Sequence, residues 1–337
     1  MSFQKLSDVF SCAKRGEEKD TKEMLISDEI SMNMKSLCDY NKFKANYIYD
    51  RILGKGGFGI VYEGFRWSDG LPVAVKCIEK SSVNSWGFVD GVRVPLELCL
   101  MCQVSCIAGV IQVLDASETK SQFFIVMERP TSCRDLFDFI SERVVLSEAM
   151  AKSFFRQALQ TIYECYQAGV LHRDIKDENI LIDLQTYKLK LIDFGAGAYV
   201  KETPFDDFSG TLMYAPPEWL KYKTYNGMEL TVWTLGIFLY IMVFGQIPFK
   251  DKQQVLRGSV VFKETQNISA DCQNLILSML EVYPENRPTL DQVLSHPWLR
   301  SEATNKDSTR SQSKLSKRLQ FWRSFGHLWD NNLQLYH

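Results

Sequence analysis

The stretch HRDIKDEN, residues 172–179, is the most informative part of the sequence because its chemistry differs sharply from its surroundings. It holds three acidic residues, two basic residues, a histidine and an asparagine, and apolar runs flank it at residues 169–171 and 180–182. Burying such a cluster without partners costs several kcal/mol for each unpaired charge. The stretch is therefore either a solvated turn or a loop whose charges hold a ligand.

Composition limits the class of protein. Of the 337 residues, 45% are hydrophobic and 24% are charged, which is typical of a globular chain long enough to form two lobes. The net charge of −2 gives no reason to expect binding to nucleic acid. The N-terminus lacks the apolar segment of a secretory signal, and the nine cysteines are typical of reduced thiols. We therefore expect a monomer of the cytoplasm that can also enter the nucleus.

Two stretches have a second interpretation. Cys99, Cys102 and Cys106 could be metal ligands, but no histidine is near and a fourth ligand is missing, so a core helix is favoured. The apolar run from Val232 to Phe249 approaches the length of a membrane span. It contains two glycines, a glutamine and a proline, which favours a buried core helix and no transmembrane segment.

The hydrophobic pattern predicts an α+β fold with two lobes. From Tyr47 to Met127, short runs rich in β-branched and aromatic residues alternate with glycine, which indicates an antiparallel sheet with one helix near residues 94–104. Beyond this region helical periodicity dominates. It is clearest in a helix that Ser147 would cap and that ends at Gly169. Both ends of the chain are polar and are expected to be flexible.

A glycine-rich segment, LGKGGFGIVY, contains Gly54, Gly56 and Gly59, a spacing that lets a backbone turn approach phosphate groups closely. The motif alone is weak evidence. A dinucleotide-binding turn would open a helix, whereas this one leads into a strand, which favours a hairpin that covers a nucleotide. Lys76, in the next apolar strand, then needs an anionic partner, for which Glu97 is the candidate. Taken alone, Lys76 could also be a surface lysine.

The segment KLKLIDFGAGA places Asp193 directly after another apolar strand. A carboxylate there, together with the amide of Asn179, supplies the hard oxygen ligands suited to Mg²⁺. HRDIKDEN is then a phosphoryl-transfer loop, in which Asp174 accepts the proton of a substrate hydroxyl and Lys176 neutralises the transferring group. The order and spacing of these motifs argue against a solvated turn.

Three further motifs extend this pattern: GTLMYAPPEW (210–219), ENRPT (285–289) and HPWL (296–299). Together with the upstream motifs they resemble protein kinases over about residues 47–300. The resemblance implies the two-lobed protein kinase fold, with ATP and Mg²⁺ as cofactors and proteins as substrates. It divides the chain into an N-terminal segment (1–42), a small lobe (43–128), a hinge (129–133), a large lobe (134–300) and a tail (301–337).

Individual positions refine this assignment. Lys176 and Thr211 resemble serine/threonine kinases rather than tyrosine kinases, and by resemblance Thr211 is also a substrate-binding residue. In the kinase family, the counterparts of Glu218 and Arg287 form an ion pair that ties the peptide-binding segment to the large lobe. The resemblance therefore implies this pair here.

The stretch MERPTSCRDLFDFI, residues 127–140, follows the last strand of the small lobe and is the expected adenine-binding hinge. Pro130 has no N–H, so it cannot donate the second hydrogen bond that most kinase hinges offer. With this proline, the stretch resembles the PIM kinases. By that resemblance Met127 is the gatekeeper and the Glu128 carbonyl accepts a hydrogen bond from the adenine amino group. The nucleotide-binding residues so implied are Leu53, Gly54, Gly56, Gly59, Val61, Ala74, Lys76, Met127, Glu128 and Pro130.

Three positions concern activity. Kinases usually carry an aspartate that braces the catalytic loop where this chain has Thr231, and PIM kinases also lack that acid. Asp207 is placed to meet Arg173 as a built-in anion in place of a phosphate, whereas PIM-like enzymes carry a second acid where this chain has Ser209. Every residue needed for Mg·ATP chemistry is present, so an active kinase is favoured over a pseudokinase scaffold.

PIM kinases favour substrates with basic residues three and five positions before the phosphorylated residue (−3 and −5). Asp135, Asp138 and Glu178 match the family's acids, so we expect a −3 subsite. At the −5 subsite this chain lacks acids at four positions where they are common in the family: Ile241, Gln246, Lys250 and Lys252. Only Asp251 remains there, so we expect strong basic selection at −3 and weak selection at −5.

The tail segment KLSKRLQFWRSFGHLW, residues 314–329, is basic and aromatic. One interpretation is an amphipathic helix that binds calmodulin or an acidic membrane. The alternatives are docking on the large lobe and disorder.

Overall fold

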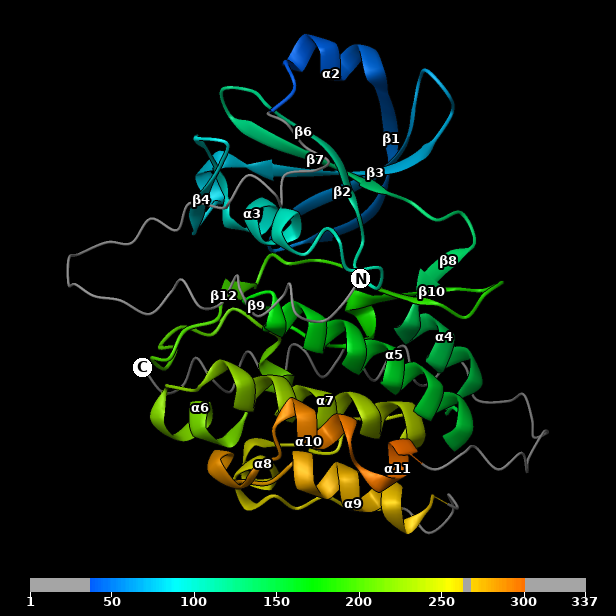
Figure 1. Ribbon diagram of the computed structural model, residues 1–337, viewed down its shortest axis with the longest axis vertical. Coiled ribbons are helices and arrows are strands. Elements are labelled where there is room, and N and C mark those ends of the chain that lie inside the picture. The colour runs from blue at the N-terminus through cyan, green and yellow to red at the C-terminus, as the bar shows by residue number, and fades with distance from the viewer. Residues whose placement is uncertain (1–36, 263–267, 301–337) are drawn as a thin grey trace, which may run out of the picture.

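The computed structural model describes residues 37–262 and 268–300, which form two lobes stacked along the long axis (Figure 1). The upper lobe is built on a sheet and the lower lobe is mostly helical, so the predicted α+β fold class is confirmed. The tail segment 314–329, with the partners predicted for it, lies outside the described residues.

The small lobe is built on a five-stranded antiparallel sheet in the order β1-β2-β3-β7-β6. Its strands are β1 (Tyr47–Gly56), β2 (Gly59–Arg66), β3 (Pro72–Glu79), β6 (Val113–Glu118) and β7 (Gln122–Glu128). Successive residues of a strand face opposite sides of a sheet. One side carries Tyr47, Val73, Val75 and Phe124, which form a separate apolar cluster with Phe43. The other side carries Ala74, Ile78, Phe123 and Ile125, which belong to the main core cluster that continues into the large lobe.

The helix α2 (Tyr40–Asn46) lies over the top of this sheet and was not predicted from the sequence (Figure 1). The Asp39 carboxylate caps it by accepting hydrogen bonds from the backbone N–H groups of Asn41 and Lys42. Phe43 is fully buried. The boundary drawn from the sequence at residue 43 therefore cuts through a helix that belongs to the small lobe.

The helix α3 (Leu96–Gln103) lies where the sequence predicts the one main helix of the small lobe. A hairpin of β4 (Trp86–Val89) and β5 (Val92–Pro95), which the sequence did not indicate, leads into it. Cys99 is fully buried in the core, whereas Cys106 is exposed, so the cysteines of this region do not share one site. The core-helix interpretation therefore holds for Cys99 and Cys102, which lie in α3, and is wrong for Cys106, which lies beyond the end of the helix.

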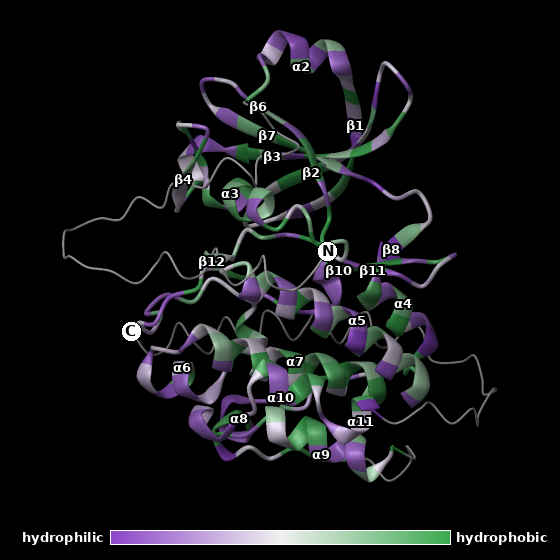
Figure 2. Cartoon of the chain, viewed as in Figure 1, coloured by the Kyte–Doolittle hydropathy of each residue, from purple (hydrophilic) through white to green (hydrophobic). Residues whose placement is uncertain are grey.

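The large lobe is organised around α7 (Gly227–Phe244), which packs against α5 (Glu148–Gln167) and α9 (Ala270–Met279). By length and composition α7 could cross a membrane, but 89% of its apolar window is buried inside the protein. Figure 2 shows α7 as largely hydrophobic and the outer helix α6 (Pro217–Tyr222) as largely hydrophilic. Among the described residues, the apolar run is thus a core helix. Ser147 caps α5, as predicted, by accepting from the Met150 N–H at 3.3 Å.

Short strands position the loops between the lobes. HRDIKDEN lies between β9 (Val170–Leu171) and β10 (Ile180–Asp183), and Asp193 lies between β11 (Leu189–Leu191) and β12 (Ala198–Tyr199). Because β10 pairs with β11 and β9 pairs with β12, the two loops are held side by side. The other strands and α-helices of the large lobe in the described ranges are β8 (Cys133–Asp135), α4 (Leu136–Arg143), α8 (Lys252–Arg257), α10 (Leu290–Leu294) and α11 (Pro297–Arg300).

Candidate active site

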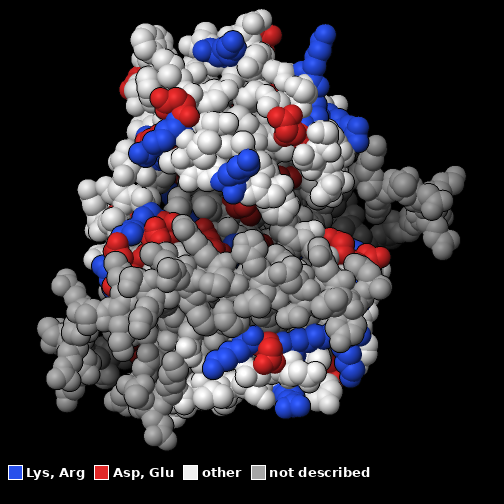
Figure 3. Space-filling view, turned by 180° about the vertical axis from the view of Figure 1, so that it is seen from behind, with Lys and Arg blue, Asp and Glu red and all other residues white. Residues whose placement is uncertain are grey.

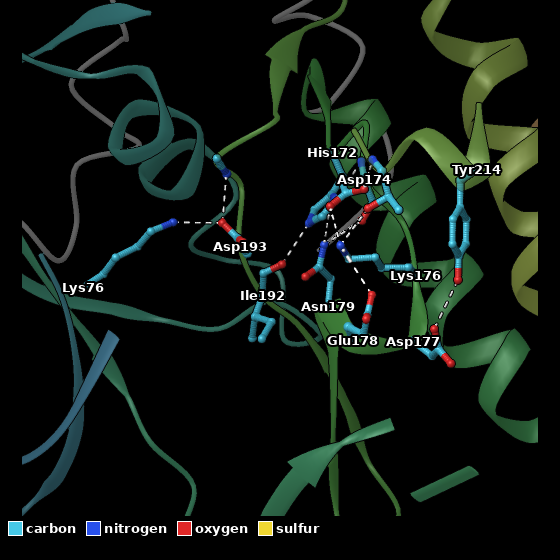
Figure 4. Close-up of polar contacts among 12 residues, drawn as sticks. Lys76, His172, Asp174, Lys176, Asp177, Glu178, Asn179, Ile192, Asp193 and Tyr214 are labelled. Carbon is cyan, nitrogen blue, oxygen red and sulfur yellow. Dashed lines mark hydrogen bonds and ion pairs between the residues drawn. The ribbon is translucent and has the colours of Figure 1, made fainter. Parts of the chain in front are cut away.

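The stretch HRDIKDEN and Asp193 lie on two adjacent loops, and Lys76 extends toward Asp193 from β3 (Figure 4). Arg173 has a φ of 62° and Asp193 a φ of 63°, in the left-handed region that non-glycine residues rarely adopt. Such backbone strain costs about 1–3 kcal/mol per residue and persists where the surroundings fix it. The loops are therefore held in place by contacts rather than by local preference.

His172 provides one of these contacts and was not assigned a role from the sequence. Its Nε2 lies 2.9 Å from the Ile192 carbonyl, and its Nδ1 accepts from the Asp174 N–H at 3.3 Å. Burial lowers the pKa of His172, so the neutral ring can donate at one nitrogen and accept at the other. Thr231, at the position where the resemblance to kinases would place a bracing acid, donates to the Gly227 carbonyl within α7 at 2.7 Å.

Lys76 joins the small lobe to the Asp193 loop. Its Nζ lies 2.5 Å from Glu97 Oε1 and 2.8 Å from Asp193 Oδ1. Burial disfavours the ammonium charge, but the two carboxylates outweigh burial and raise the pKa of Lys76 above its ordinary value. Burial also opposes the charge of Asp193, yet Lys76 outweighs it and lowers the pKa of that carboxyl. The structure thus brings Lys76 and Glu97 together and adds Asp193 to the pair.

Asp174 is buried among hydrogen-bond donors. Its Oδ1 accepts from the Thr211 N–H at 2.7 Å, and its Oδ2 accepts from Asn179 Nδ2 at 3.0 Å. Lys176 Nζ lies 3.1 Å from the same Oδ2 and donates to Thr211 Oγ1 at 2.7 Å. These contacts hold the carboxylate in one orientation, as a base that must meet a substrate hydroxyl requires.

Asn179 and Asp193 are the candidate magnesium ligands. Asn179 Nδ2 also donates to the Asp174 carbonyl at 2.8 Å, which leaves Oδ1 as the ligating atom, and Figure 4 shows that oxygen on the side of Asp193. No three His, Cys, Asp or Glu side chains form a closed metal site in residues 37–262 or 268–300. An open pair of oxygen ligands fits Mg²⁺, which completes its shell with phosphates and water.

The residues assigned to the adenine lie on the lower face of the sheet. Val61 pairs with Lys76 and Ala74 pairs with Met127, so the alternation of the strands places all four side chains on the face opposite the Phe43 cluster. Leu53 precedes the glycine-rich turn and is 46% exposed. Glu128 ends β7, and Pro130 follows it in the connection to β8.

The glycine-rich turn fits a ligand's phosphate groups. A Cβ on Gly59 would lie 2.4 Å from the Cys77 carbonyl oxygen, and φ there is +128°, so the fold itself requires glycine. A Cβ on Gly54 or Gly56 would meet no protein atom within 4 Å. Packing within the protein does not explain these two glycines, whereas close approach of a phosphate does.

Arg173 anchors the segment between Asp193 and Glu218, which we call the activation segment. Its Nη1 and Nη2 donate to Asp207 Oδ1 at 3.1 Å and Oδ2 at 3.0 Å, and its Nε donates to the Ala196 carbonyl at 2.7 Å. Partial burial opposes the charge of Asp207, but Arg173 outweighs it and lowers the pKa of that carboxyl. The contact between Asp207 and Arg173 is the one predicted from the sequence.

Tyr225 completes the Arg173 site and was missed from the sequence. Its hydroxyl accepts from Arg173 Nη1 at 3.2 Å. Its ring stacks on Phe205 at a centroid distance of 5.5 Å, and the two backbones exchange two hydrogen bonds. Tyr225 therefore clamps the activation segment from the α6–α7 connection.

Glu218 and Arg287 form the predicted ion pair. Arg287 Nη1 and Nη2 donate to Glu218 Oε1 at 2.8 Å and Oε2 at 2.7 Å. The Arg287 side chain is 0% exposed and the Glu218 side chain is 7% exposed. Arg287 also stacks on the Trp233 ring, 4.9 Å from its centroid. This pair ties the end of the activation segment to α7 and to the segment before α10.

The three acids assigned to the −3 subsite are close together. Burial, with the charges of Asp138 and Glu178, raises the pKa of Asp135. Asp135 also caps α4 by accepting from the Asp138 N–H at 2.6 Å. Lys176 lies 3.4 Å from Glu178, and Arg134 lies 3.8 Å from Asp138. Figure 3, seen from behind, shows charged side chains of both signs on the edge where α4 and β8 lie.

The residues assigned to the −5 subsite are not all on the surface. Ile241 is 1% exposed and belongs to the α7 core, so assigning it to a surface subsite was wrong. Lys250 and Lys252 are exposed. Asp251 caps α8 by accepting from the Gln254 N–H at 2.9 Å, so the one acid of this region is engaged in the fold.

Comparison with known proteins gives a consistent result. A family model described as a protein kinase domain matches residues 47–299. The serine/threonine-protein kinase pim-2 of Danio rerio is 41% identical over 287 residues, which cover 82% of this chain and 92% of that protein. The serine/threonine-protein kinase prk-2 of Caenorhabditis elegans is 41% identical over 294 residues, covering 86% of this chain and 66% of that protein. The PAS domain-containing serine/threonine-protein kinase of Mus musculus is 35% identical over 260 residues, which cover 75% of this chain and 18% of that protein.

Proposed function

Because the chain belongs to the protein kinase family, as a serine/threonine kinase similar to the PIM kinases, we propose that it transfers the γ-phosphoryl group of Mg·ATP to serine or threonine residues that follow basic residues. The observation that carries the proposal is the arrangement at Asp174, whose carboxylate is held by Lys176, Asn179 and Thr211. A scaffold without catalysis has no need of a carboxylate oriented in this way.

The groups of the site have separate roles in this reaction. Lys76 binds the phosphates from the small lobe, held in place by its carboxylate partners. Asn179 and Asp193 would hold Mg²⁺, which offsets the negative charge of the phosphates when bound. Asp174 orients the substrate hydroxyl and accepts its proton. Lys176, 3.1 Å away, stabilises the negative charge of the transferring group.

Substrate selection is proposed to follow the charges beside the site. Asp135, Asp138 and Glu178 form an acidic cluster that suits an arginine at −3. Lys250 and Lys252 are exposed, and neither has a carboxylate within ion-pair distance among the described residues. Their positive charges oppose the attraction of Asp251 for a second arginine at −5, so selection for a basic residue there should be weak.

A positional-scanning peptide library with Mg·ATP tests the reaction and this ranking together. We expect Arg at −3 to raise kcat/KM by about tenfold or more, because hydrogen bonds to charged groups contribute about 1.5–3 kcal/mol. Arg at −5 should raise it less than about threefold, within the range of an exposed pair. Equal gains at −3 and −5 would contradict the proposal, and so would no phosphorylation of any peptide.

The double variant Asp135→Asn, Glu178→Gln tests whether these two carboxylates cause the preference for arginine at −3. Asparagine keeps the cap of α4, so the variant removes charge without removing the helix cap. We expect the −3 preference to fall severalfold. Glu142→Gln, on the same helix and paired with Arg134 at 2.7 Å, is the matched control and should retain the preference.

We further propose that the activation segment needs no phosphorylation, because Asp207 and Tyr225 already hold Arg173. Protein treated with a phosphatase should then keep its activity within about twofold. Asp207→Ala should lower kcat about fivefold or less, the range of a pair that is partly exposed. Ser209→Ala, whose hydroxyl lies 3.4 Å from Arg173 Nη2, is the control and should be near wild type. Collapse of activity after phosphatase treatment would refute the proposal.

A further inference from the structure

Glu128, the last residue of β7, is tied to the large lobe through its side chain. Lys190, in the middle of β11, donates to Glu128 Oε1 at 2.5 Å. The same oxygen accepts from the Gln112 backbone N–H at 2.9 Å, and the Glu128 N–H donates to the Gln112 carbonyl at 2.9 Å. Glu128 is therefore held both through its backbone and through its side chain.

Lys190 also contacts the segment that connects α3 to β6. Its Nζ lies 3.4 Å from the Ala108 carbonyl oxygen and 3.3 Å from that of Val110. The next residue, Leu191, exchanges two backbone hydrogen bonds with residues 109–111. Lys190 thus joins three segments: the α3–β6 connection, the end of β7, and the strand that leads to the magnesium ligand of the candidate site.

Recognition of the adenine depends strongly on the position of the Glu128 carbonyl in this chain. Pro130 has no N–H, so under the proposed function the adenine depends on the Glu128 carbonyl for its hydrogen bond to the hinge. Hydrogen bonds weaken steeply when distance or angle leaves a narrow range. A small displacement of Glu128 would therefore weaken recognition of the base, and Pro130 cannot compensate with a second bond.

We propose that Lys190 is a positioning residue for the adenine. Through the Glu128 side chain it fixes the carbonyl that accepts the hydrogen bond of the 6-amino group. The inference rests on the proposed function, because it requires a nucleotide base at Glu128. It goes beyond that function by giving a part in base recognition to a residue of the large lobe that is not among those assigned to the nucleotide.

Lys190→Met tests the inference because it removes the charge and keeps an unbranched side chain. We expect KM for Mg·ATP to rise about three- to fivefold, the range of a partly exposed ion pair, with kcat within about twofold. Lys190→Arg should restore most of the affinity. Adding Glu128→Gln to Lys190→Met should cause no further loss, because the contact between Lys190 and Glu128 is already broken in the single variant. Lys188→Met, exposed and close by in the chain, is the matched control and should leave both constants unchanged.

A second readout separates positioning from general loosening. Equilibrium binding of ATP is compared with that of purine riboside triphosphate, which lacks the 6-amino group. Lys190→Met should reduce the preference for ATP, whereas a loosened lobe would weaken both nucleotides equally. An unchanged preference, or the same change in Lys188→Met, overturns the inference. Binding is measured without peptide, so a protein that binds ATP but phosphorylates nothing would refute the proposed function while the role of Lys190 is still decided.

Discussion

Replacing Asp174 by asparagine is expected to lower kcat for peptide phosphorylation by at least about 100-fold, because an amide cannot accept the proton of the substrate hydroxyl. Affinity for Mg·ATP should stay within about threefold of wild type. Among the partners of Asp174, Asn179 is a candidate magnesium ligand, but its Nδ2 also donates to the Asp174 backbone carbonyl at 2.8 Å, a contact that the substitution keeps. Steady-state kinetics together with a nucleotide titration measure both quantities.

Asp193→Asn provides the comparison for this experiment. Asp193 contacts Lys76 at 2.8 Å and is a candidate magnesium ligand, so its loss should weaken Mg·ATP binding as well as turnover. The two variants should therefore differ in nucleotide affinity. If Asp174→Asn phosphorylates peptide at the wild-type rate, or if it loses Mg·ATP as strongly as Asp193→Asn, the roles given to the two carboxylates are wrong.

The sequence predicts most of the fold because its signals are local. The strands of the five-stranded sheet, α3 and the capped start of α5 are marked by alternation, periodicity and Ser147 within a few residues. The helix α2 was missed because its seven residues carry one buried apolar side chain, Phe43, and so show no period. Ile241 was misplaced for a related reason: α7 is apolar on all sides, so no periodicity tells which of its residues reach the surface.

Residues of the candidate site could be predicted where they stand in short motifs. Contacts between residues far apart in the sequence could not be predicted. Asp174, Asn179 and Asp193 stand in short motifs whose spacing implies their proximity. Tyr225 lies 52 residues from Arg173, and Lys190 lies 62 residues from Glu128. Tyr225 stands in no quoted motif, and Lys190 lies in KLKLIDFGAGA without any signal that distinguishes it from a surface lysine, because a hydroxyl or an ammonium that braces another residue leaves no local pattern. Such contacts follow from the pairing of strands and loops, which only the structure supplies.

Arg287→Ala is expected to lower the free energy of unfolding of the large lobe by about 3–5 kcal/mol, because it leaves the Glu218 carboxylate buried without its bidentate partner. It also removes the stacking on Trp233 and a hydrogen bond to the Glu281 carbonyl at 2.9 Å. Urea denaturation measures the loss as a lower midpoint, with an unchanged slope if unfolding stays two-state.

Arg134→Ala is the matched control for this measurement. Arg134 also contacts two carboxylates, those of Glu142 at 2.7 Å and Asp138 at 3.8 Å, but it does so at the surface, where an ion pair contributes about 1 kcal/mol or less. The double variant Glu218→Ala, Arg287→Ala should lose less than the sum of the single losses, because no buried charge is left unpaired. If Arg287→Ala lowers the free energy of unfolding no more than Arg134→Ala does, burial does not strengthen the Glu218–Arg287 pair. The activation segment is then anchored by Arg173 and Tyr225 instead.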